Sequence, residues 1–427
     1  MDNPRMKVVG GTLYFTWDEG IGVKMERLKN NSAGEPQAEV TVRLLEPHGY
    51  HVAGKVLGAD RLVLTSRSGK DGAIRTLNKR IEDAPLEWFK VIEHAASEAV
   101  EHMRVSTPMV MIGDEEPPGS INQGFALYPV IRKGVSTVMY GEGGSGKSLF
   151  AIYFAMLIQG GFDANGLRGT PGSVLYCDWE TDQEDFTQRL FAIQEGDANL
   201  EGVALAYRHC SQPFLAELEA IAAIVTEHKI DTIVIDSFEA ALSKNSNESE
   251  SIQPFFNALR DLIPGGITAL LIDHKSKEDS TKNNSAGPIG SVMKLNRARS
   301  VWEMSQDSNG VVGMIHRKVN TGRKQPPLGF DVDFVGDETL DKVTFRRTDI
   351  AQSDLRVKLS VRDRVYSTLR GGEMGLEELA IATGDDKQQV SNLLHRKTRK
   401  PSAFQQNENG KWCLRQIRVS TTYVQGR

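Results

Sequence analysis

The sequence predicts an α/β protein in which a parallel sheet flanked by helices follows a small β-rich domain and precedes a winged-helix module. From residue 125 to about residue 343, apolar strand-like runs alternate with helical segments, which is typical of a parallel sheet covered by helices. Residues 1–84 instead alternate apolar and polar positions between Gly, Asn, Asp and Ser clusters, as β-strands joined by turns do. Residues 357–418 show three short helical patterns and then a hairpin, the order of a winged helix.

Composition fits an ordinary folded chain. Its 427 residues are 39% hydrophobic and 25% charged, enough for two or three domains. No apolar run approaches the roughly 20 residues of a membrane helix, and the first thirty residues lack a secretion-signal pattern. The three scattered cysteines have neither disulfide-framework nor metal-site spacing. We therefore expect a cytoplasmic protein with no membrane partner.

We expect four segments along the chain. They are a β-rich N-terminal domain ending in a helix (1–105), a linker (106–120), a core of alternating strands and helices (121–350) and a winged helix-turn-helix (355–418). The helix is predicted from Pro85 to about Met103, with Leu86, Phe89, Ile92 and Ala96 on one face. In the core, strands are predicted over 136–140, 173–177, 232–235, 269–272 and 313–316. Helices are predicted over 148–159, 182–194, 213–228, 251–262 and 291–299.

One motif dominates the core. Residues 141–148, Gly-Glu-Gly-Gly-Ser-Gly-Lys-Ser, fit G-x-x-x-x-G-K-S between a predicted strand and a predicted amphipathic helix. Such a loop turns its backbone N–H groups toward phosphates, here from Gly141, Gly143, Gly144, Ser145 and Gly146. Lys147 would reach the β- and γ-phosphates, and the Ser148 hydroxyl would ligate Mg²⁺. The sequence therefore predicts a site for ATP and Mg²⁺.

A second magnesium ligand should end a neighbouring apolar strand. The run at 232–235 ends in Asp236, which we assign to that role; the alternative is an aspartate that only caps the strand end. The next residue is Ser237 rather than Glu. That disfavours ATPase families whose catalytic base directly follows the magnesium aspartate.

The strand predicted at 173–177 is followed by Asp178-Trp179-Glu180. A glutamate at this sheet edge would point into the phosphate crevice, so Glu180 is our candidate for the base that orients the attacking water. Asp178 falls earlier and fits the role less well. Alternatively, the acidic residues cap the next helix, which is the role we expect of Asp182.

Two further groups follow later strands. His274 could sense the γ-phosphate and signal its presence to the polar loop 276–287; the alternative is a histidine with a structural role. Lys277 and Lys282 of that loop could bind a DNA backbone, unless the loop has no function. The cations of the run 316–323 could supply a finger to a neighbouring subunit's ATP site, unless they are a solvated charge run. Arg297 or Arg299 could also face the nucleotide.

With these motifs, residues 121–345 resemble the RecA-type ATPases, and among them the plasmid- and phage-encoded RepA-type hexameric helicases. The loop 141–148, Glu180 and Asp236 match that family's nucleotide loop, catalytic glutamate and magnesium aspartate. His274 with Lys277 resembles the family's histidine-then-lysine motif, and Gly290-Ser291 with Arg299 resembles its Gly-Ser helix and arginine. Lys318-Val319-Asn320 resembles its Lys-x-Asn strand end. The resemblance implies a RecA-like fold, a hexameric ring, and a Lys-x-Asn strand end that points across the subunit boundary.

The sequence departs from this family at two places. Asp273 stands where many members have a first histidine. Thr321-Gly322 replaces an aromatic–Gly pair, so the residue that would reach the neighbouring subunit's ATP site could be Lys318, Arg317 or Arg323.

The C-terminal module is basic. Residues 355–418 carry 13 Lys and Arg against 7 Asp and Glu, or +6, in a chain of net charge −5. The third predicted helix, capped by Asp385, turns Lys387, Gln388, Gln389, Asn392, His395 and Arg396 outward. Lys397, Arg399 and Lys400 would meet phosphates, and Asn407–Gly410 would tip a wing. A solvated basic face, or a winged helix that binds proteins, is the alternative.

Together these features favour an ATP-dependent helicase or translocase that forms a ring on single-stranded DNA in phage or plasmid replication. The alternatives are a recombination mediator without unwinding activity and an ATP-gated DNA-binding regulator. Expected partners are single-stranded and duplex DNA, further copies of the chain, and replication or recombination proteins.

Overall fold

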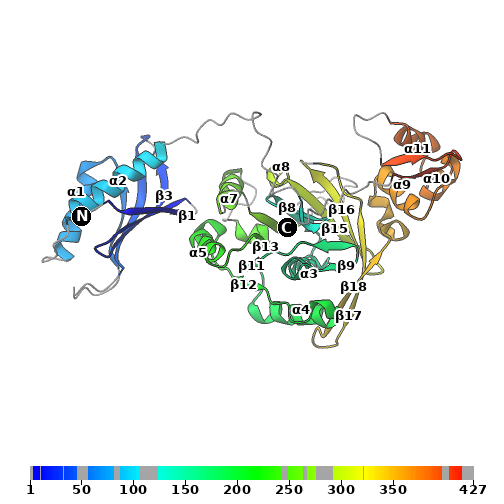
Figure 1. Cartoon of the computed structure of the whole chain (residues 1–427), viewed down its shortest axis with the longest axis horizontal. Helices are drawn as coiled ribbons and strands as arrows, with labels where there is room; N and C mark the ends of the chain where they lie inside the picture. Colours follow the sequence, from blue (N-terminus) through cyan, green and yellow to red (C-terminus); the bar gives the residue numbers. More distant parts are fainter. Residues whose placement is uncertain are drawn as a thin grey trace, which may run out of the picture. The chain divides into compact units, whose positions relative to one another are not determined.

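The computed structural model (Figure 1) describes residues 3–9, 11–31, 33–45, 56–80, 87–104, 124–242, 249–262, 267–275, 292–320, 322–396 and 403–415. The chain divides into two compact units. The first comprises Met1–Ile121, Phe214–Lys229 and Pro254–Gly266. The second comprises Asn122–Pro213, Ile230–Gln253 and Ile267–Arg427.

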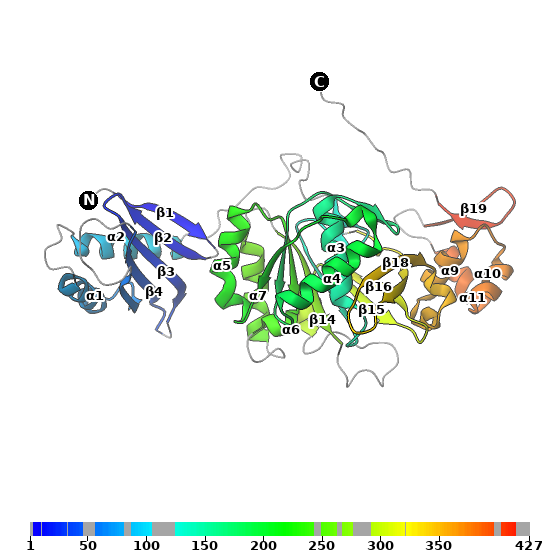
Figure 2. The same cartoon turned by 90° about the horizontal axis from the view of Figure 1, so that it is seen from below.

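The N-terminal segment folds into a five-stranded antiparallel sheet in sequence order (Figure 2). Its strands are β1 (Arg5–Val9), β2 (Thr12–Trp17), β3 (Ile21–Asn30), β4 (Pro36–Leu44) and β5 (Val56–Val63). The predicted alternation is clear in β2, where Leu13, Phe15 and Trp17 are buried. Helices α1 (Arg67–Arg80) and α2 (Trp88–Arg104) pack against this sheet and each other.

Two details of this segment correct the sequence prediction. The cluster Ser68–Gly72 was expected as a turn between strands, but it lies inside α1, where only Leu77 is fully buried. In α2, Ile92 and Ala96 are buried as predicted, whereas Phe89 is 60% exposed and Trp88 takes the buried position. Leu86 and the predicted linker 106–120 lie outside the described residues.

The core holds a nine-stranded sheet in the order β12-β11-β13-β14-β8-β15-β16-β17-β18. The strands are β8 (Ser136–Gly141), β11 (Val174–Asp178), β12 (Ala206–His209), β13 (Thr232–Asp236), β14 (Thr268–His274), β15 (Ser300–Gln306), β16 (Val311–Val319), β17 (Leu328–Val335) and β18 (Lys342–Thr348). The first six in spatial order are parallel. Four of them, β8, β11, β13 and β14, were predicted as parallel strands, whereas β12 and β15 were not predicted.

The last three strands are antiparallel, so the sheet is mixed and the expected all-parallel sheet is wrong. Residues 313–316 were predicted as one more parallel strand, but they belong to β16. The turn 307–310 joins β16 to β15, with Gly310 at φ 85° and Asp307 accepting the N–H of Val311. A parallel connection needs about a dozen residues, so this short turn makes the pair a hairpin.

The helices follow the predicted order, with bounds shifted by a few residues. They are α3 (Lys147–Gly160), α4 (Gln183–Gly196), α5 (Phe214–Glu227), α6 (Phe238–Ala241), α7 (Ser249–Asp261) and α8 (Val292–Arg297). The helix after the glycine loop was expected to be amphipathic, but every α3 side chain from Phe150 to Ile158 is buried. It packs against β11 and β14 of the main sheet and against a small second sheet. That sheet contains β6 (Phe125–Tyr128), β7 (Ile131–Arg132), β9 (Asp163–Ala164) and β10 (Leu167–Gly169).

The C-terminal segment has the predicted order of three helices and a hairpin. The elements are α9 (Val361–Arg370), α10 (Leu376–Thr383), α11 (Lys387–Leu394), β19 (Phe404–Gln406) and β20 (Trp412–Leu414). Their apolar side chains form a cluster of their own that includes Val365, Leu379, Val390 and Trp412. Asp386 caps α11, not Asp385 as predicted, because Asp385 pairs with Arg364 instead.

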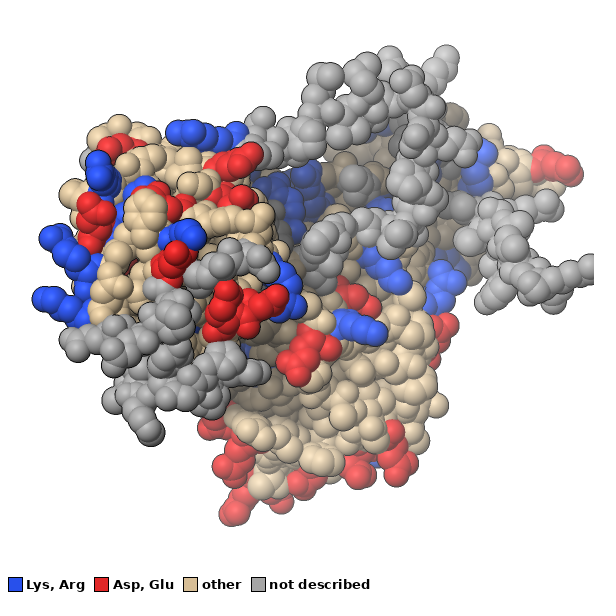
Figure 3. Space-filling view, turned by 60° about the vertical axis from the view of Figure 1, so that its left-hand side comes forward, with Lys and Arg blue, Asp and Glu red and all other residues tan. Residues whose placement is uncertain are grey.

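None of the helices in the described part of the chain is long and apolar enough to cross a bilayer. On the face in Figure 3, Lys and Arg are interspersed with Asp and Glu, and the lower margin carries mainly acidic side chains.

Candidate active site

The glycine loop joins the buried strand β8 to the buried helix α3. Gly144 and Gly146 have φ of 77° and 81°, where residues with a side chain are strained. Gly141 is constrained differently, because a Cβ there would lie 2.4 Å from the carbonyl oxygen of Met304. Nothing lies within 4 Å of a Cβ built on Gly143, so this part of the loop faces open space. The loop therefore has the curvature and the room that a phosphate chain needs.

Lys147 begins α3 and is only 5% exposed. Its Nζ donates to the carbonyl oxygens of Gly141, at 3.2 Å, and Glu142, at 2.8 Å. Burial lowers the pKa of this lysine, while the carboxylates of Asp236 and Glu180 act in the opposite direction. The ammonium group thus lies over the loop and between the two acidic residues.

Asp236 ends β13 and has one unsatisfied oxygen. Its Oδ2 accepts a 2.6 Å hydrogen bond from Tyr176, whereas Oδ1 is buried and accepts none from the described residues. Burial raises the pKa of this carboxyl to about 6, against the lowering effect of Tyr176 and the Ser148 hydroxyl. An orphaned carboxylate oxygen beside a serine hydroxyl fits a hard divalent cation such as Mg²⁺. The residues predicted to hold magnesium therefore lie together.

Glu180 and His274, predicted separately as base and sensor, form a pair. They follow β11 and end β14, the strands on either side of β13, and Glu180 Oε1 lies 2.9 Å from His274 Nε2. This hydrogen bond is the main cause of the lowered pKa of Glu180 and of the raised pKa of His274. The site therefore favours an ionised glutamate beside a protonated histidine.

The other acidic residues of this turn have structural roles. Asp178 is buried, and its Oδ1 accepts the N–H groups of Glu180 and Thr181 at 2.9 and 3.0 Å. Asp182 caps α4 by accepting the N–H of Asp185. The capping alternative thus holds for Asp182 alone, because Asp178 binds the turn before α4, while the Glu180 side chain faces the nucleotide loop's pocket.

That pocket has a volume of about 310 Å³ and contains several of the predicted residues. It is lined by Gly144, Gly146, Lys147, Ser148, Leu149, Glu180, Thr181, Arg189, Asp236, Ile272 and His274. A second cavity of about 260 Å³ flanks the other side of the loop, where Phe150, Val332, Phe334 and Phe345 supply apolar walls and Gln306 a polar one. Together the two cavities offer polar and apolar space on either side of one loop.

The basic residues at the end of β16 differ in burial and in their contacts. His316 is 6% exposed and stacks on Trp302, and burial lowers its pKa to about 4, so it does not belong to a cationic cluster. Lys318 Nζ donates to the carbonyl oxygens of Leu295, Asn296 and Ala298 at the end of α8. Lys318 of β16 therefore caps the C-terminal end of α8 within the same chain.

The remaining finger candidates also differ in their contacts. Arg317 Nε donates to Glu303 Oε2 at 2.6 Å and is 37% exposed, while Arg323 and Arg299 are exposed. Arg297 bonds to Gln253. None of these residues lines the two cavities beside the loop, and the choice of finger stays a prediction. The loop 276–287, Gly290-Ser291, Thr321 and Lys397–Lys400 lie outside the described residues.

Sequence reasoning missed the roles of four residues. Asp273 and Lys294 form an ion pair of 3.0 Å, and both side chains are fully buried. Tyr176 holds Asp236, and Arg189 lines the nucleotide pocket from α4. The one available signal was a tyrosine within an otherwise apolar strand.

Comparison with known proteins bears on this part of the chain. Residues 108–280 match the family model described as AAA domain, and no curated protein matches the sequence. The matched range contains the glycine loop, Glu180, Asp236 and His274, and it ends before Lys318 and Arg323. With the geometry above, this match supports a nucleotide-binding domain of the P-loop ATPase type in residues 108–280.

Proposed function

We propose that the chain is an ATP-dependent DNA translocase or helicase, which forms a ring and acts on single-stranded DNA in phage or plasmid replication. The observation that carries the proposal is the Glu180–His274 pair beside Lys147 and Asp236. A module that only binds ATP has no need of an ionised base hydrogen-bonded to a residue at the end of β14. The resemblance to RepA-type helicases suggests the substrate and a hexameric assembly.

In this proposal, the γ-phosphate lies at Lys147, and Glu180 accepts a hydrogen bond from the attacking water. The lowered pKa of Glu180 keeps its carboxylate ionised for that role. Ser148 and Asp236 hold Mg²⁺, which neutralises charge on the phosphates when bound. Asp178 positions the base through the Glu180 N–H.

His274 connects the hydrolysis site to the rest of the chain. It shares a hydrogen bond with Glu180 and directly precedes the segment that would contact DNA. A change of charge at the γ-phosphate changes which partner His274 prefers. Hydrolysis can therefore bias the position of the segment after β14.

The nucleobase would occupy the apolar cavity on the other side of the loop. Phe334 is 49% exposed there and can cover an aromatic ring, while Gln306 offers a polar edge.

A second candidate is an ATP-gated DNA-binding regulator. It is favoured by the polar face of α11, whose exposed residues take no part in the apolar cluster of the C-terminal segment; they are Lys387, Gln388, Gln389 and Asn392. Such a face suits the major groove. In that case the C-terminal module is the effector, and ATP sets only the assembly state.

The two candidates differ in strand displacement. We expect the full chain with ATP to unwind forked DNA, and single-stranded DNA to raise its ATP turnover several-fold. A matched duplex without a fork, and ATP replaced by a non-hydrolysable analogue, are the controls. Specific duplex binding without displacement or stimulation would favour the regulator, and a monomer with DNA-independent turnover would contradict both.

A further inference from the structure

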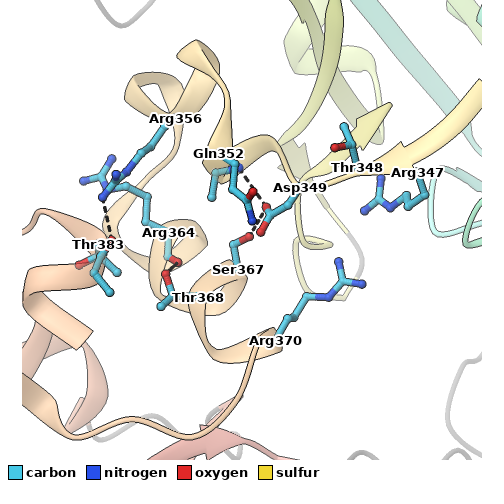
Figure 4. A pocket seen from close by; sticks show the side chains of 13 residues that line it. Arg347, Thr348, Asp349, Gln352, Arg356, Arg364, Ser367, Thr368, Arg370 and Thr383 are labelled. Carbon is cyan, nitrogen blue, oxygen red and sulfur yellow. Dashed lines mark hydrogen bonds between the residues drawn. The ribbon is translucent and has the colours of Figure 1, made fainter. Parts of the chain in front are cut away.

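A large polar cavity lies apart from the ATP site, between the end of β18 and the helices α9 and α10 (Figure 4). Its volume is about 670 Å³, in the range of small-ligand sites. The lining residues are Arg347, Thr348, Asp349, Ala351, Gln352, Arg356, Arg364, Ser367, Thr368, Arg370, Gly371, Ala382 and Thr383. With four arginines and one aspartate, its formal charge is +3, although the whole chain is at −5.

Two of the four arginines hold the module together. Arg364 forms a two-point ion pair with Asp385, and Arg356 donates to the carbonyl oxygen of Ala382 at 3.0 Å. These contacts fix the turn between α10 and α11. The charge of Arg364 is therefore balanced by a carboxylate, and Arg356 contacts the α10 end of the same turn.

The other two arginines have no carboxylate partner among the described residues. Arg347 donates to the carbonyl oxygens of Gly329 and Pro327, and it lies over the Phe330 ring. Arg370 ends α9 and is exposed, and its guanidinium group makes no hydrogen bond to the described residues. Figure 4 shows both side chains reaching toward the same space. Burial and then the charge of Arg370 lower the pKa of Arg347 to about 10, as expected of like charges that share a cavity.

The one carboxylate of the lining, Asp349, acts against the lowering of the pKa of Arg347 but forms no ion pair with either arginine in the described part of the chain. Asp349 accepts a hydrogen bond from the Ser367 hydroxyl of α9, and it caps the short helix Ile350–Gln352 by accepting the N–H of Ala351. The hydroxyl of Thr348 and the amide of Gln352 complete the polar wall. No aromatic residue lines the cavity, so it offers no platform for stacking a base.

We propose that this cavity binds clustered phosphate groups through Arg347 and Arg370, with the sugar–phosphate backbone of DNA as the favoured source and a free nucleotide as the other. Guanidinium groups match phosphate geometry, and a lining without aromatic rings contacts phosphates without reading bases. The DNA source rests on the proposed function. The cavity would then give the strand a sequence-independent anchor between the ATPase sheet and the C-terminal helices.

The first arm of the test measures salt dependence of binding to labelled oligo-dT, with the ATP site saturated by a non-hydrolysable analogue. Loss of one phosphate contact on a single strand reduces the slope of log affinity against log salt by about 0.7. We expect this reduction in Arg370→Ala, little change in Arg370→Lys, and none in Arg362→Ala. Arg362 is the matched control because it lies on the same helix outside the cavity.

The second arm measures nucleotide bound per protomer by equilibrium dialysis. A nucleotide-binding cavity gives two per protomer in the parent chain and one in Arg370→Ala. If the stoichiometry is one in both and the salt slope falls, DNA is the source. Unchanged slope and unchanged stoichiometry overturn the inference, as does an equal slope loss in Arg362→Ala. If the parent chain binds no DNA, the proposed function is contradicted. The nucleotide stoichiometry then tests phosphate binding in the cavity independently.

Discussion

At the scale of single residues, Glu180 should carry hydrolysis. Glu180→Gln keeps the shape of the side chain but removes the charge that orients water, so we expect turnover to fall about 10²–10⁴-fold while ATP affinity changes little. Asp182→Asn is the matched control, since it makes the same chemical change at an exposed cap of α4. Steady-state turnover and equilibrium nucleotide binding would be measured side by side. Turnover near the parent value in Glu180→Gln would assign the base elsewhere.

His316 gives a pH-dependent prediction. Its pKa is about 4 in the folded chain, because burial disfavours the imidazolium, against about 6.5 when unfolded. The unfolded state therefore binds the extra proton first, and stability is lost as pH falls below 6.5. Relative to His316→Gln, the parent chain should lose about 1–2 kcal/mol between pH 6.5 and pH 5.

Denaturant unfolding of both proteins at the two pH values would measure this difference. Asp236, with its raised pKa, acts in the opposite direction but is common to both proteins, so it cancels. Equal pH dependence in the two proteins would mean that His316 is not held neutral.

At the scale of elements, α8 is fastened to β14 by the buried Asp273–Lys294 pair. Lys294→Met leaves a buried carboxylate without its cation, so we expect a loss of about 3–5 kcal/mol in unfolding free energy. Asp273→Asn combined with Lys294→Met removes both charges and should recover much of that loss. Urea unfolding of the single and double variants tests this coupling, and additive losses would argue against it.

The same elements show what sequence could predict. The loop 141–148 and the strands around it were predictable, because fixed glycine spacing and continuous apolar runs are local signals. Strand β15 was not, since Glu303 and Ser305 interrupt its apolar pattern. The placement of Glu303 depends on Lys275 and Arg317, which lie far from it in sequence.

Helix α1 was missed for a related reason. Gly69 and Gly72 are turn residues by local preference, yet contacts of α1 with β5 and α2 favour the helix. The pairing of Glu180 with His274 likewise needed strand order, which periodicity does not give. The sequence therefore predicted the chemical roles of single residues better than it predicted which residues they contact.

At the scale of the whole molecule, the core and the C-terminal helices meet at a boundary that the sequence placed at residue 355. The structure puts Leu355 and Leu359 in a small apolar cluster with Ile315 and Ile350. Lys358 also donates to Ser305 of β15. The segment up to Leu359 thus packs with the ATPase sheet, whereas Val365 and Leu369 pack within the C-terminal cluster.

Two truncations test this boundary. Removal of residues 361–427 should leave basal ATP turnover within about two-fold and weaken duplex binding, because the cluster around Ile315 is intact. Removal of 355–427 exposes that cluster and should cost about 2–4 kcal/mol, since two buried leucines are lost. Thermal unfolding and turnover of both truncated chains, beside the full chain, give the comparison. If the shorter deletion also abolishes turnover, the C-terminal helices complete the ATPase itself, and their role as a separate DNA-binding module fails.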